Sequence, residues 1–251
     1  MRMTGNTILI TGGGSGIGRG LAEAFHRLGN RVIITGRRTS VLDEVVAANP
    51  GMIRYALDVT DPAAIAEFGR QVVADNPELN VLINNAGMME RDELTPDALD
   101  LPASEATIIT NLLGPVRMTA ALLPHMRGQP NAAIVNVTSG LAFVPLANTA
   151  AYSATKAGLH SYTLSLRRQL EASGVEVIEL APPGVQTDLT PGQSSFAAYM
   201  PLDAFIDEVM TLFAQEPTPD EILVTNVKRL RHAEADGTFD KMFALLNPPH
   251  G

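Results

Sequence analysis

Three side chains suited to proton transfer follow a short apolar segment of this 251-residue chain. Residues 132–138 are apolar and β-branched, and they predict a buried strand with Ser139 at its carboxyl end. Residues 150–171 have a helical period, which places Tyr152 and Lys156 one turn apart on one helix face. The sequence therefore predicts a hydroxyl, a phenol and an ammonium group close together at a strand end, where open α/β sheets bind their ligands.

These three groups could interconvert a carbonyl and an alcohol. A free tyrosine has a pKa of about 10, too high for a base at neutral pH. A neighbouring lysine charge favours the phenolate and lowers this pKa, so that Tyr152 could exchange a proton with a substrate oxygen. The Ser139 hydroxyl could donate to the same oxygen. Such a reaction also needs a hydride carrier. The alternative is an exposed aromatic residue beside a solvated charge.

A glycine-rich turn near the amino terminus predicts the site of that carrier. Residues 7–10 and 31–35 predict two strands, and between them the segment Thr-Gly-Gly-Gly-Ser-Gly-Ile-Gly (11–18) leads into a helix. In a βαβ unit of about 30 residues, such a turn admits a dinucleotide pyrophosphate to the helix N-terminus. The alternative is a turn without a ligand. The expected contacts are Gly12, Ser15, Gly16, Ile17 and Gly18.

The end of the second predicted strand indicates which dinucleotide is bound. NAD binders usually carry an acidic residue here, which holds the ribose 2′-hydroxyl. This chain has Gly36, Arg37 and Arg38 instead. A guanidinium can form paired hydrogen bonds with a 2′-phosphate. The pattern therefore favours NADP over NAD, unless both arginines are ordinary surface charges.

The third predicted strand ends in a candidate adenine contact. Residues 52–57 have the composition of a strand, and Asp58 and Val59 follow it. Asp58 is placed either to meet the adenine edge or to cap the next helix. Thr60 or Asp61 could serve as that cap equally well.

Two more strand ends predict close backbone contacts with the cofactor. A strand at 80–83 is followed by Asn-Asn-Ala-Gly, whose small and amide side chains allow the backbone to pass beside a ribose. A strand at 175–180 runs into the rigid turn Ala-Pro-Pro-Gly-Val-Gln-Thr, which could cover a nicotinamide. The expected contacts are Asn85, Ala86, Gly87, Pro183, Gly184, Val185 and Thr187.

An asparagine inside a predicted helix at 98–126 is a further candidate. Asn111 is mildly unfavourable in a helix, and Gly114 and Pro115 close behind it indicate a break or kink. Such a kink could free a backbone group to hold a water molecule. A packed or solvent-facing asparagine is the alternative.

The rest of the sequence predicts one domain with a substrate lid. Residues 188–200 mix polar and bulky apolar side chains, and 188–215 is expected to form a substrate lid that includes a helix at 202–213. Residues 222–227 predict the last strand and 239–246 a short helix. Residues 1–251 thus predict a single dinucleotide-binding and catalytic α/β domain, a Rossmann-type doubly wound parallel sheet of about seven strands with helices on both faces.

Composition limits the classes of function. The net charge of −9 argues against a nucleic-acid surface. The chain has no cysteine, which excludes disulfides and thiolate metal sites, and no metal is expected. No apolar run reaches the roughly 18 residues of a membrane span. The chain begins with no long apolar targeting segment, so we expect a cytoplasmic protein with no membrane partner.

Together, these motifs resemble the short-chain dehydrogenase/reductase family over about residues 6–190. The resemblance implies a Rossmann fold and hydride transfer with NAD(P). It makes Tyr152 the general acid/base and Ser139 the residue that orients the substrate oxygen. It also implies that Lys156 lowers the pKa of Tyr152 and binds the nicotinamide ribose, and that Asn111 holds a water of a proton relay. The matching segments are 11–18, 84–87, Asn111, Ser139, Tyr152-x-x-x-Lys156, 183–184 and Thr187, and Gly36-Arg37 is similar to the NADP-preferring pattern.

One departure from the family affects the expected assembly. A glycine-rich segment usually follows the last strand and often builds a tetramer contact, but here residues 225–229 read Thr-Asn-Val-Lys-Arg. We expect a homodimer or homotetramer. The dimer contact expected from the family uses the helices at 98–126 and 150–171.

The leading interpretation is an NADP-dependent oxidoreductase of the carbonyl reductase or alcohol dehydrogenase type, acting on a small molecule. One alternative is an NADPH-binding sensor or assembly protein with vestigial activity, and another is a dehydratase or epimerase on the same fold. An apolar, medium-sized substrate pocket is expected, although core packing would explain several of its residues. These are Leu141, Phe143, Leu189, Phe196 and Tyr199.

Overall fold

Seven parallel strands form one sheet in a computed structural model that describes residues 1–91 and 101–248. Their order is β3-β2-β1-β4-β5-β6-β7, as predicted for a doubly wound Rossmann-type α/β fold. The strands are β1 (Thr7–Thr11), β2 (Arg31–Gly36), β3 (Ile53–Ala56), β4 (Leu79–Asn84), β5 (Ala133–Val137), β6 (Glu176–Leu180) and β7 (Glu221–Ile222).

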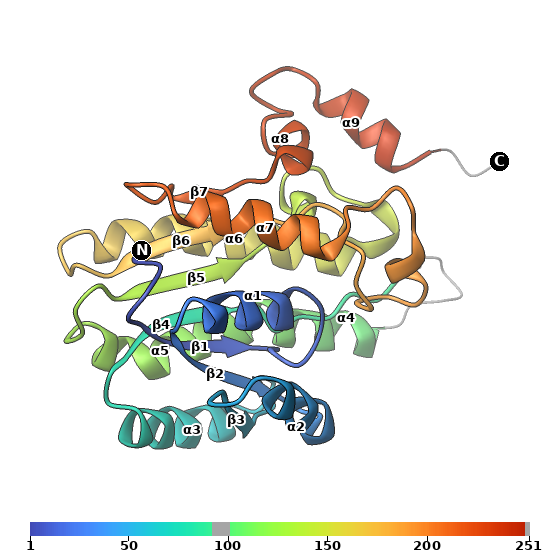
Figure 1. Ribbon diagram of the computed structural model, residues 1–251. Helices are drawn as coiled ribbons and strands as arrows, with labels where there is room; N and C mark the ends of the chain where they lie inside the picture. The colour runs from blue at the N-terminus through green and yellow to red at the C-terminus, as the bar shows by residue number, and fades with distance from the viewer. Residues whose placement is uncertain (92–100, 249–251) are drawn as a thin grey trace.

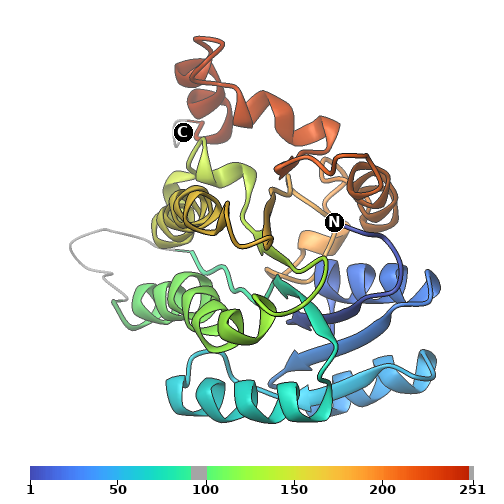
Figure 2. The same ribbon diagram turned by 90° about the vertical axis from the view of Figure 1, so that its left-hand side faces the viewer.

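Helices connect successive strands and cover the sheet on both sides (Figures 1 and 2). The α-helices are α1 (Gly16–Arg27), α2 (Thr39–Ala48), α3 (Pro62–Asp75), α4 (Leu101–Ile108), α5 (Gly114–Met126), α6 (Ala150–Leu170), α7 (Leu202–Phe213), α8 (Thr225–Arg231) and α9 (Phe239–Leu246). The π-helix η1 (Ile109–Leu113) joins α4 to α5, and the short 3₁₀ turns are η2 (Gly140–Ala142), η3 (Ala147–Thr149) and η4 (Gln193–Ser195).

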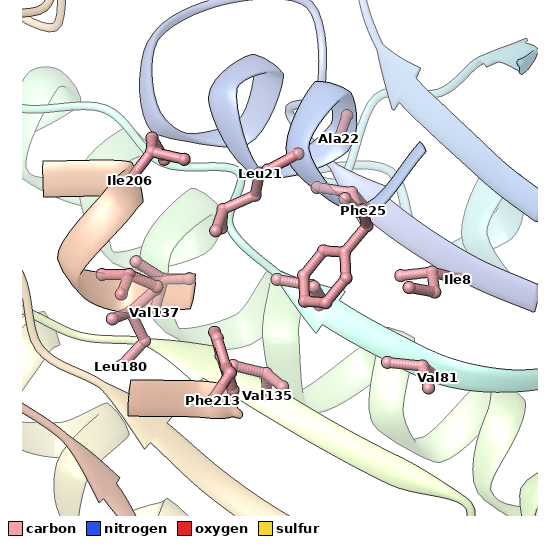
Figure 3. Packing of buried hydrophobic residues seen from close by; sticks show 14 of the residues in the cluster. Ile8, Leu21, Ala22, Phe25, Val81, Val135, Val137, Leu180, Ile206 and Phe213 are labelled. Carbon is pink, nitrogen blue, oxygen red and sulfur yellow. The ribbon is translucent and has the colours of Figure 1, made fainter. Parts of the chain in front are cut away.

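The central strands β1, β4 and β5 are buried along their whole length and mostly apolar, because helices cover both faces of the sheet. Side chains alternate along β1, so Ile8 and Ile10 belong to one core while Leu9 belongs to the other. The first core packs α1, α2 and α7 against the sheet, and the second packs α3, α5 and α6 against the opposite face. Figure 3 shows Phe25 of α1 and Phe213 of α7 meeting over the strands, with ring centroids 5.9 Å apart.

The sheet topology sets where a ligand can bind. The chain proceeds from β1 outward to β3, and then returns to the other side of β1 to form β4. Helices that follow β1 and β4 therefore leave on different sides, and a crevice opens between the carboxyl ends of these two strands. The motifs predicted at strand ends all lie along this edge.

The helical run Leu101–Met126 is long and rich in apolar residues. Among the described residues it is the one helix long and apolar enough, by length and composition, to cross a membrane. Met118, Leu122 and Met126 nevertheless pack into the core beneath the sheet. The run also contains Glu105, Asn111 and Arg117, so it is not an uninterrupted apolar segment.

The predicted last strand is only partly correct. Residues 222–227 were expected to be extended, but β7 ends at Ile222 and helix α8 begins at Thr225. The Glu208 carboxylate of α7 accepts hydrogen bonds from Thr225 N and Oγ1 at 2.7 and 2.8 Å, and so holds the first residue of α8. Helices α8 and α9 lie beyond the β7 edge of the sheet (Figure 1).

Candidate active site

A cleft of about 380 Å³ opens at the carboxyl ends of the strands. Its walls come from the glycine turn after β1, the ends of β2, β4 and β5, the start of α6 and the turn after β6. These are the segments in which the sequence predicted separate ligand contacts. The fold thus brings them together around one cavity.

The glycine turn leaves space that side chains would fill. Gly12 has a φ of +68°, and a Cβ atom there would lie 2.9 Å from Ala86 Cα. A Cβ on Gly18 would lie 2.3 Å from the Gly12 carbonyl oxygen. Helix α1 begins at Gly16 and has no acidic residue in its first turn. The turn therefore offers a close backbone approach and an uncompensated helix N-terminus, which suit an anionic group.

The loop after β4 holds this turn in place. Thr11 Oγ1 accepts hydrogen bonds from the backbone nitrogens of Asn85 and Ala86 at 3.0 and 3.1 Å. The Asn85 side chain donates to the carbonyls of Thr11 and Gly12 at 3.0 and 3.2 Å. Asn85, Ala86 and Gly87 also line the cleft. The Asn85 side chain thus fixes the glycine turn, in addition to any contact with a ligand.

The end of β2 forms a basic corner of the cleft. Arg37 and Arg38 are exposed and line it, and Arg38 Nη2 donates to Ser15 Oγ at 3.3 Å. Beside them, the buried hydroxyl of Thr35 has no hydrogen-bond partner among the described residues. Buried polar groups are normally paired. A polar ligand in this corner would satisfy Thr35, so the cleft fits a nucleotide here as well as at the glycine turn.

The structure distinguishes the two roles considered for Asp58. Asp61 caps α3, with its carboxylate accepting from Ala63 N and Ala64 N. Asp58 instead accepts from Thr60 N and Oγ1 at 2.9 and 2.8 Å and lines the cleft, as Val59 does. Partial burial disfavours the Asp58 carboxylate, but the Thr60 hydrogen bonds and the Arg37 charge outweigh burial and lower the pKa of Asp58.

The opposite end of the cleft is formed by the end of β5 and the start of α6. The residues that line it there are Val137, Thr138, Ser139, Tyr152 and Lys156. Ser139 and Tyr152 are buried and joined by a hydrogen bond between their side chains. Ser139 Oγ also accepts from Leu141 N at 3.1 Å, so its own hydrogen is directed to the phenol oxygen. Lys156 is buried as well, and its ammonium donates to the Val137 carbonyl at 2.8 Å.

The predicted lowering of the Tyr152 pKa is not found. Burial of the phenol dominates and, although the Ser139 hydrogen bond favours the phenolate and the Tyr199 phenol disfavours it, the pKa of Tyr152 is raised to about 12. Burial likewise lowers the pKa of Lys156 to about 8. The charge of Lys156 favours the phenolate, but the desolvation of both groups outweighs that effect. At neutral pH the phenol is therefore a proton donor.

Asn111 lies in the π-helix η1, where the helix departs from its regular hydrogen-bonding pattern. Its side chain is fully buried. Asn111 Oδ1 accepts from Met88 N at 2.9 Å, and Nδ2 donates to Met88 O at 2.8 Å. The break predicted before Gly114 is this π-turn, in which Gly114 N bonds to Ile109 O. Asn111 therefore clamps the segment after Gly87, and its role in a water relay stays a prediction.

The turn after β6 contributes Pro183, Val185 and Thr187 to the cleft, as expected from the sequence. Gly184 is not among the cleft-lining residues. A Cβ there would lie 2.6 Å from the Tyr199 ring, so the absence of a side chain at Gly184 lets that ring pack against the backbone. The Gly184 carbonyl also accepts from Met200 N at 2.9 Å. Gly184 thus joins the turn to the segment 188–200.

The five predicted substrate-pocket residues fall into two groups. Leu189 lines the cleft, whereas the other four do not. Phe196 packs edge-on against Tyr199, with ring centroids 4.8 Å apart. Leu141 and Phe143 lie outside the lining residues. Phe143 instead contacts His160 and Arg231, in a cluster behind the cleft. The buried face of α7 belongs to the core, and within the predicted lid 188–215 the residues that line the cleft are Asp188, Leu189 and Gln193.

Several cleft residues were missed by the sequence analysis. Thr35 and Thr138 sit at the ends of strands, and their hydroxyls in otherwise apolar strands are the signal that could have marked them. Gln193 gave no signal. Its amide donates to Val185 O and Thr187 Oγ1 at 2.8 and 3.1 Å, and these contacts between distant residues exist only in the fold.

Comparison with known proteins agrees with this geometry. Residues 6–197 match the family described as short chain dehydrogenase. The chain belongs to the short-chain dehydrogenase/reductase family. It is therefore an oxidoreductase of that family, in which an NAD(P) cofactor and a small-molecule substrate are typical.

Members of the short-chain dehydrogenase/reductase family with similar sequences include a bacterial and a yeast protein. The uncharacterized oxidoreductase DltE of Bacillus subtilis is 40% identical over 250 residues, 98% of each chain. An NADPH-dependent 1-acyldihydroxyacetone phosphate reductase of Schizosaccharomyces pombe is 34% identical over 224 residues, 87% of this chain and 73% of that protein.

A solved member of the family has a closely similar fold. The short chain dehydrogenase from Burkholderia cenocepacia, determined in complex with NADP, superposes with a TM-score of 0.83 and 26% identity, covering 99% of this chain and 100% of that one. These comparisons establish the family and the fold. The substrate, the cofactor preference, the assembly and the compartment expected from the sequence stay predictions.

Proposed function

We propose that this chain is an NADPH-dependent carbonyl reductase that converts a ketone or aldehyde into an alcohol, with Tyr152 as the general acid. One observation carries the proposal: a buried, protonated phenol, hydrogen-bonded to Ser139, faces the same cleft as the glycine turn and the basic corner. Because the pKa of Tyr152 is about 12, the phenol carries its proton at neutral pH, and reduction needs a proton at the carbonyl oxygen.

The cofactor fit supports NADP over NAD. The glycine turn and the N-terminus of α1 would hold the pyrophosphate, and Arg37 and Arg38 would hold the 2′-phosphate. Lys156 would contact the nicotinamide ribose. When bound, NADPH supplies the hydride that adds to the carbonyl carbon.

Residues of this chain would supply the proton and stabilise the charge that its transfer leaves behind. Ser139 Oγ would donate to the substrate oxygen and orient it, and the proton would pass from Tyr152 Oη to that oxygen. The phenolate left behind would be stabilised by the Lys156 ammonium, which lies 5.6 Å from the centroid of the Tyr152 ring. Asn111 would keep Met88 and Gly87 in place beside the ribose.

The test is NADPH oxidation over a panel of ketones, keto-esters and aldehydes. We expect turnover by the parent, and a loss of about 10²-fold or more in kcat for Tyr152→Phe with an unchanged Kd for NADPH. Tyr162→Phe is the matched control, because that phenol lies outside the cleft lining. A Tyr152→Phe variant as active as the parent, or NADPH binding without turnover on any carbonyl, would overturn the proposal.

We further propose a homo-oligomer in which α4, α5 and α6 meet a second copy. Four large apolar side chains are exposed on these helices and the π-turn between them: Leu101, Ile108, Leu113 and Leu164. Exposed apolar residues gathered on adjacent helices are typical of a protein interface. Leu164→Glu should lower the mass measured by light scattering, whereas Leu245→Glu on α9 should not.

A further inference from the structure

A buried carboxylate lies directly behind the proposed catalytic residues. The Glu179 side chain on β6 is 1% exposed. Its two oxygens accept from Thr138 Oγ1, at 2.6 Å, and from His160 Nδ1, at 2.7 Å. Thr138 immediately precedes Ser139, and His160 lies on α6. A carboxylate with this burial needs both of its partners, since an unpaired buried charge is strongly destabilising.

These contacts complete a regular series between the end of β5 and helix α6. Tyr152, Lys156 and His160 follow at intervals of four, so they lie on one face of α6. The first bonds to Ser139 and the second to the Val137 carbonyl. His160 reaches the residue between these two, Thr138, through Glu179. Three successive residues of the strand end are thus tied to three successive turns of the catalytic helix.

A second ion pair extends the cluster to the carboxyl-terminal region. Glu221 of β7 lies opposite Glu179 in the register of the parallel strands. Arg231 of α8 binds Glu221 through two nitrogens at 2.8 and 2.9 Å. The Arg231 guanidinium lies 4.9 Å from the ring centroid of Phe143, which packs edge-on against His160. Two like charges on adjacent strands repel each other, and Arg231 offsets that repulsion.

The same cluster could be considered as a metal site. One ligand atom from each of His160, Glu179 and Glu221 lies within 4.8 Å of the others. However, Glu221 already carries a bidentate guanidinium, and one Glu179 oxygen is taken by Thr138. A metal ion would have to displace Arg231. The contacts therefore favour an ion-pair network over a cation site.

We propose that Glu179 is a positioning residue for the reduction, acting through Thr138 on Ser139 and through His160 on the helix that carries Tyr152. This inference rests on the proposed function. Under this proposal, helix α8 also helps to position the active site, because its Arg231 binds Glu221 and so offsets the repulsion between Glu221 and Glu179. Orientation at this scale matters, since a misplacement of about 1 Å can cost about 10²-fold in rate.

The kinetic test uses variants that keep the shape of the cluster. Thr138→Val and Glu179→Gln should each lower kcat about tenfold while the KM for NADPH stays within about twofold. Thr138→Ser keeps the hydroxyl and should retain the parent kcat. The double variant should be no slower than Glu179→Gln alone, because Thr138→Val acts on a contact that Glu179→Gln already changes. Glu176→Gln is the control, since this residue lies at the other end of β6.

A spectroscopic test separates this inference from the proposed function. The chain has four tyrosines, and with ring carbon Cζ labelled by ¹³C the Tyr152 signal can be assigned from Tyr152→Phe. Its shift reports the Ser139 hydrogen bond without any substrate. Thr138→Val and Glu179→Gln should move this signal, and Thr138→Ser and Glu176→Gln should leave it in place.

The two tests lead to distinct results. A moved Tyr152 signal in a protein that reduces no carbonyl would overturn the proposed function but support the positioning by Glu179. An unmoved signal, or an equal loss of kcat in Thr138→Ser and Thr138→Val, would overturn the positioning. If Arg231→Met had the same kcat as the exposed control Arg229→Met, helix α8 would not contribute to the positioning of the active site.

Discussion

The Lys156 ammonium lies 5.6 Å from the centroid of the Tyr152 ring and donates its hydrogen bond to the Val137 carbonyl. The two side chains are thus neighbours, but the lysine is anchored to the strand end and not to the phenol oxygen. Burial then acts on both groups, raising the pKa of Tyr152 to about 12 and lowering that of Lys156 to about 8. The pair therefore has a firm proton donor beside a cation that can lose its charge near neutral pH.

The rate of carbonyl reduction should fall as the pH rises through about 8. Tyr152 remains protonated until about pH 12, but Lys156 loses its charge at about pH 8 and can then no longer stabilise the phenolate. The measurement is kcat/KM against pH with saturating NADPH. Lys156→Arg, if active, should keep a flat profile, and Lys228→Arg should behave like the parent. A parent profile that stays flat to pH 10 would contradict this assignment.

Stability should depend on pH through the same lysine. Its pKa is about 8 when folded and 10.5 when free, so between these values the unfolded chain binds more protons. The free energy of unfolding then rises with pH, by about 2 kcal/mol from pH 8 to pH 10. Above about pH 10, the raised pKa of Tyr152 acts in the opposite direction.

The measurement is urea unfolding of the parent and of Lys156→Met at several pH values. The rise between pH 8 and pH 10 should be present in the parent and absent from the variant, because methionine has no proton to lose. The difference between the two proteins cancels the other titrating groups. Equal slopes for both would show that the buried ammonium does not control stability in this range.

The core strands and the motif positions were predictable because they depend on local sequence. A short β-branched apolar run such as Ile8-Leu9-Ile10, followed closely by glycines, favours a strand buried on both faces. Helix α7 was predicted with its observed bounds, since Pro201 precedes it and its apolar period is clear. By contrast, the β-branched run at 222–227 indicated a strand, and only the contact of Glu208 with Thr225 explains why a helix begins there.

The contacts that hold the catalytic residues in position were not predictable, because they join residues that are far apart in the sequence. Glu179 stands in an apolar strand, and nothing near it in the chain identifies Thr138 or His160 as its partners. The direction of the Tyr152 pKa was wrong for a related reason. The charge of Lys156 is visible in the sequence, whereas the burial that outweighs it is a property of the fold.

Removal of either arginine at the basic corner should weaken the binding of NADPH more than the binding of NADH. Arg37→Ala or Arg38→Ala deletes a charge-assisted contact with the 2′-phosphate, which should raise the Kd of NADPH about 10-fold or more. NADH lacks that phosphate, so its Kd should change little. Arg27→Ala, at the other end of α1, is the control. Equal losses for the two nucleotides would show that the arginines do not select NADP.

Gly184→Ala should affect the carbonyl substrate but not the cofactor. The new Cβ would lie 2.6 Å from the Tyr199 ring, so this ring and its neighbour Phe196 must move. Overpacking of this kind typically costs about 1 kcal/mol or more, which predicts a rise of about fivefold or more in the KM of the carbonyl substrate. The Kd of NADPH should stay the same, since Gly184 is outside the cleft lining. Gly128→Ala is the matched control, because its Cβ would meet only the His125 carbonyl at an ordinary 3.5 Å. If the two variants had the same KM for the carbonyl substrate, the segment 188–200 would not form the substrate wall.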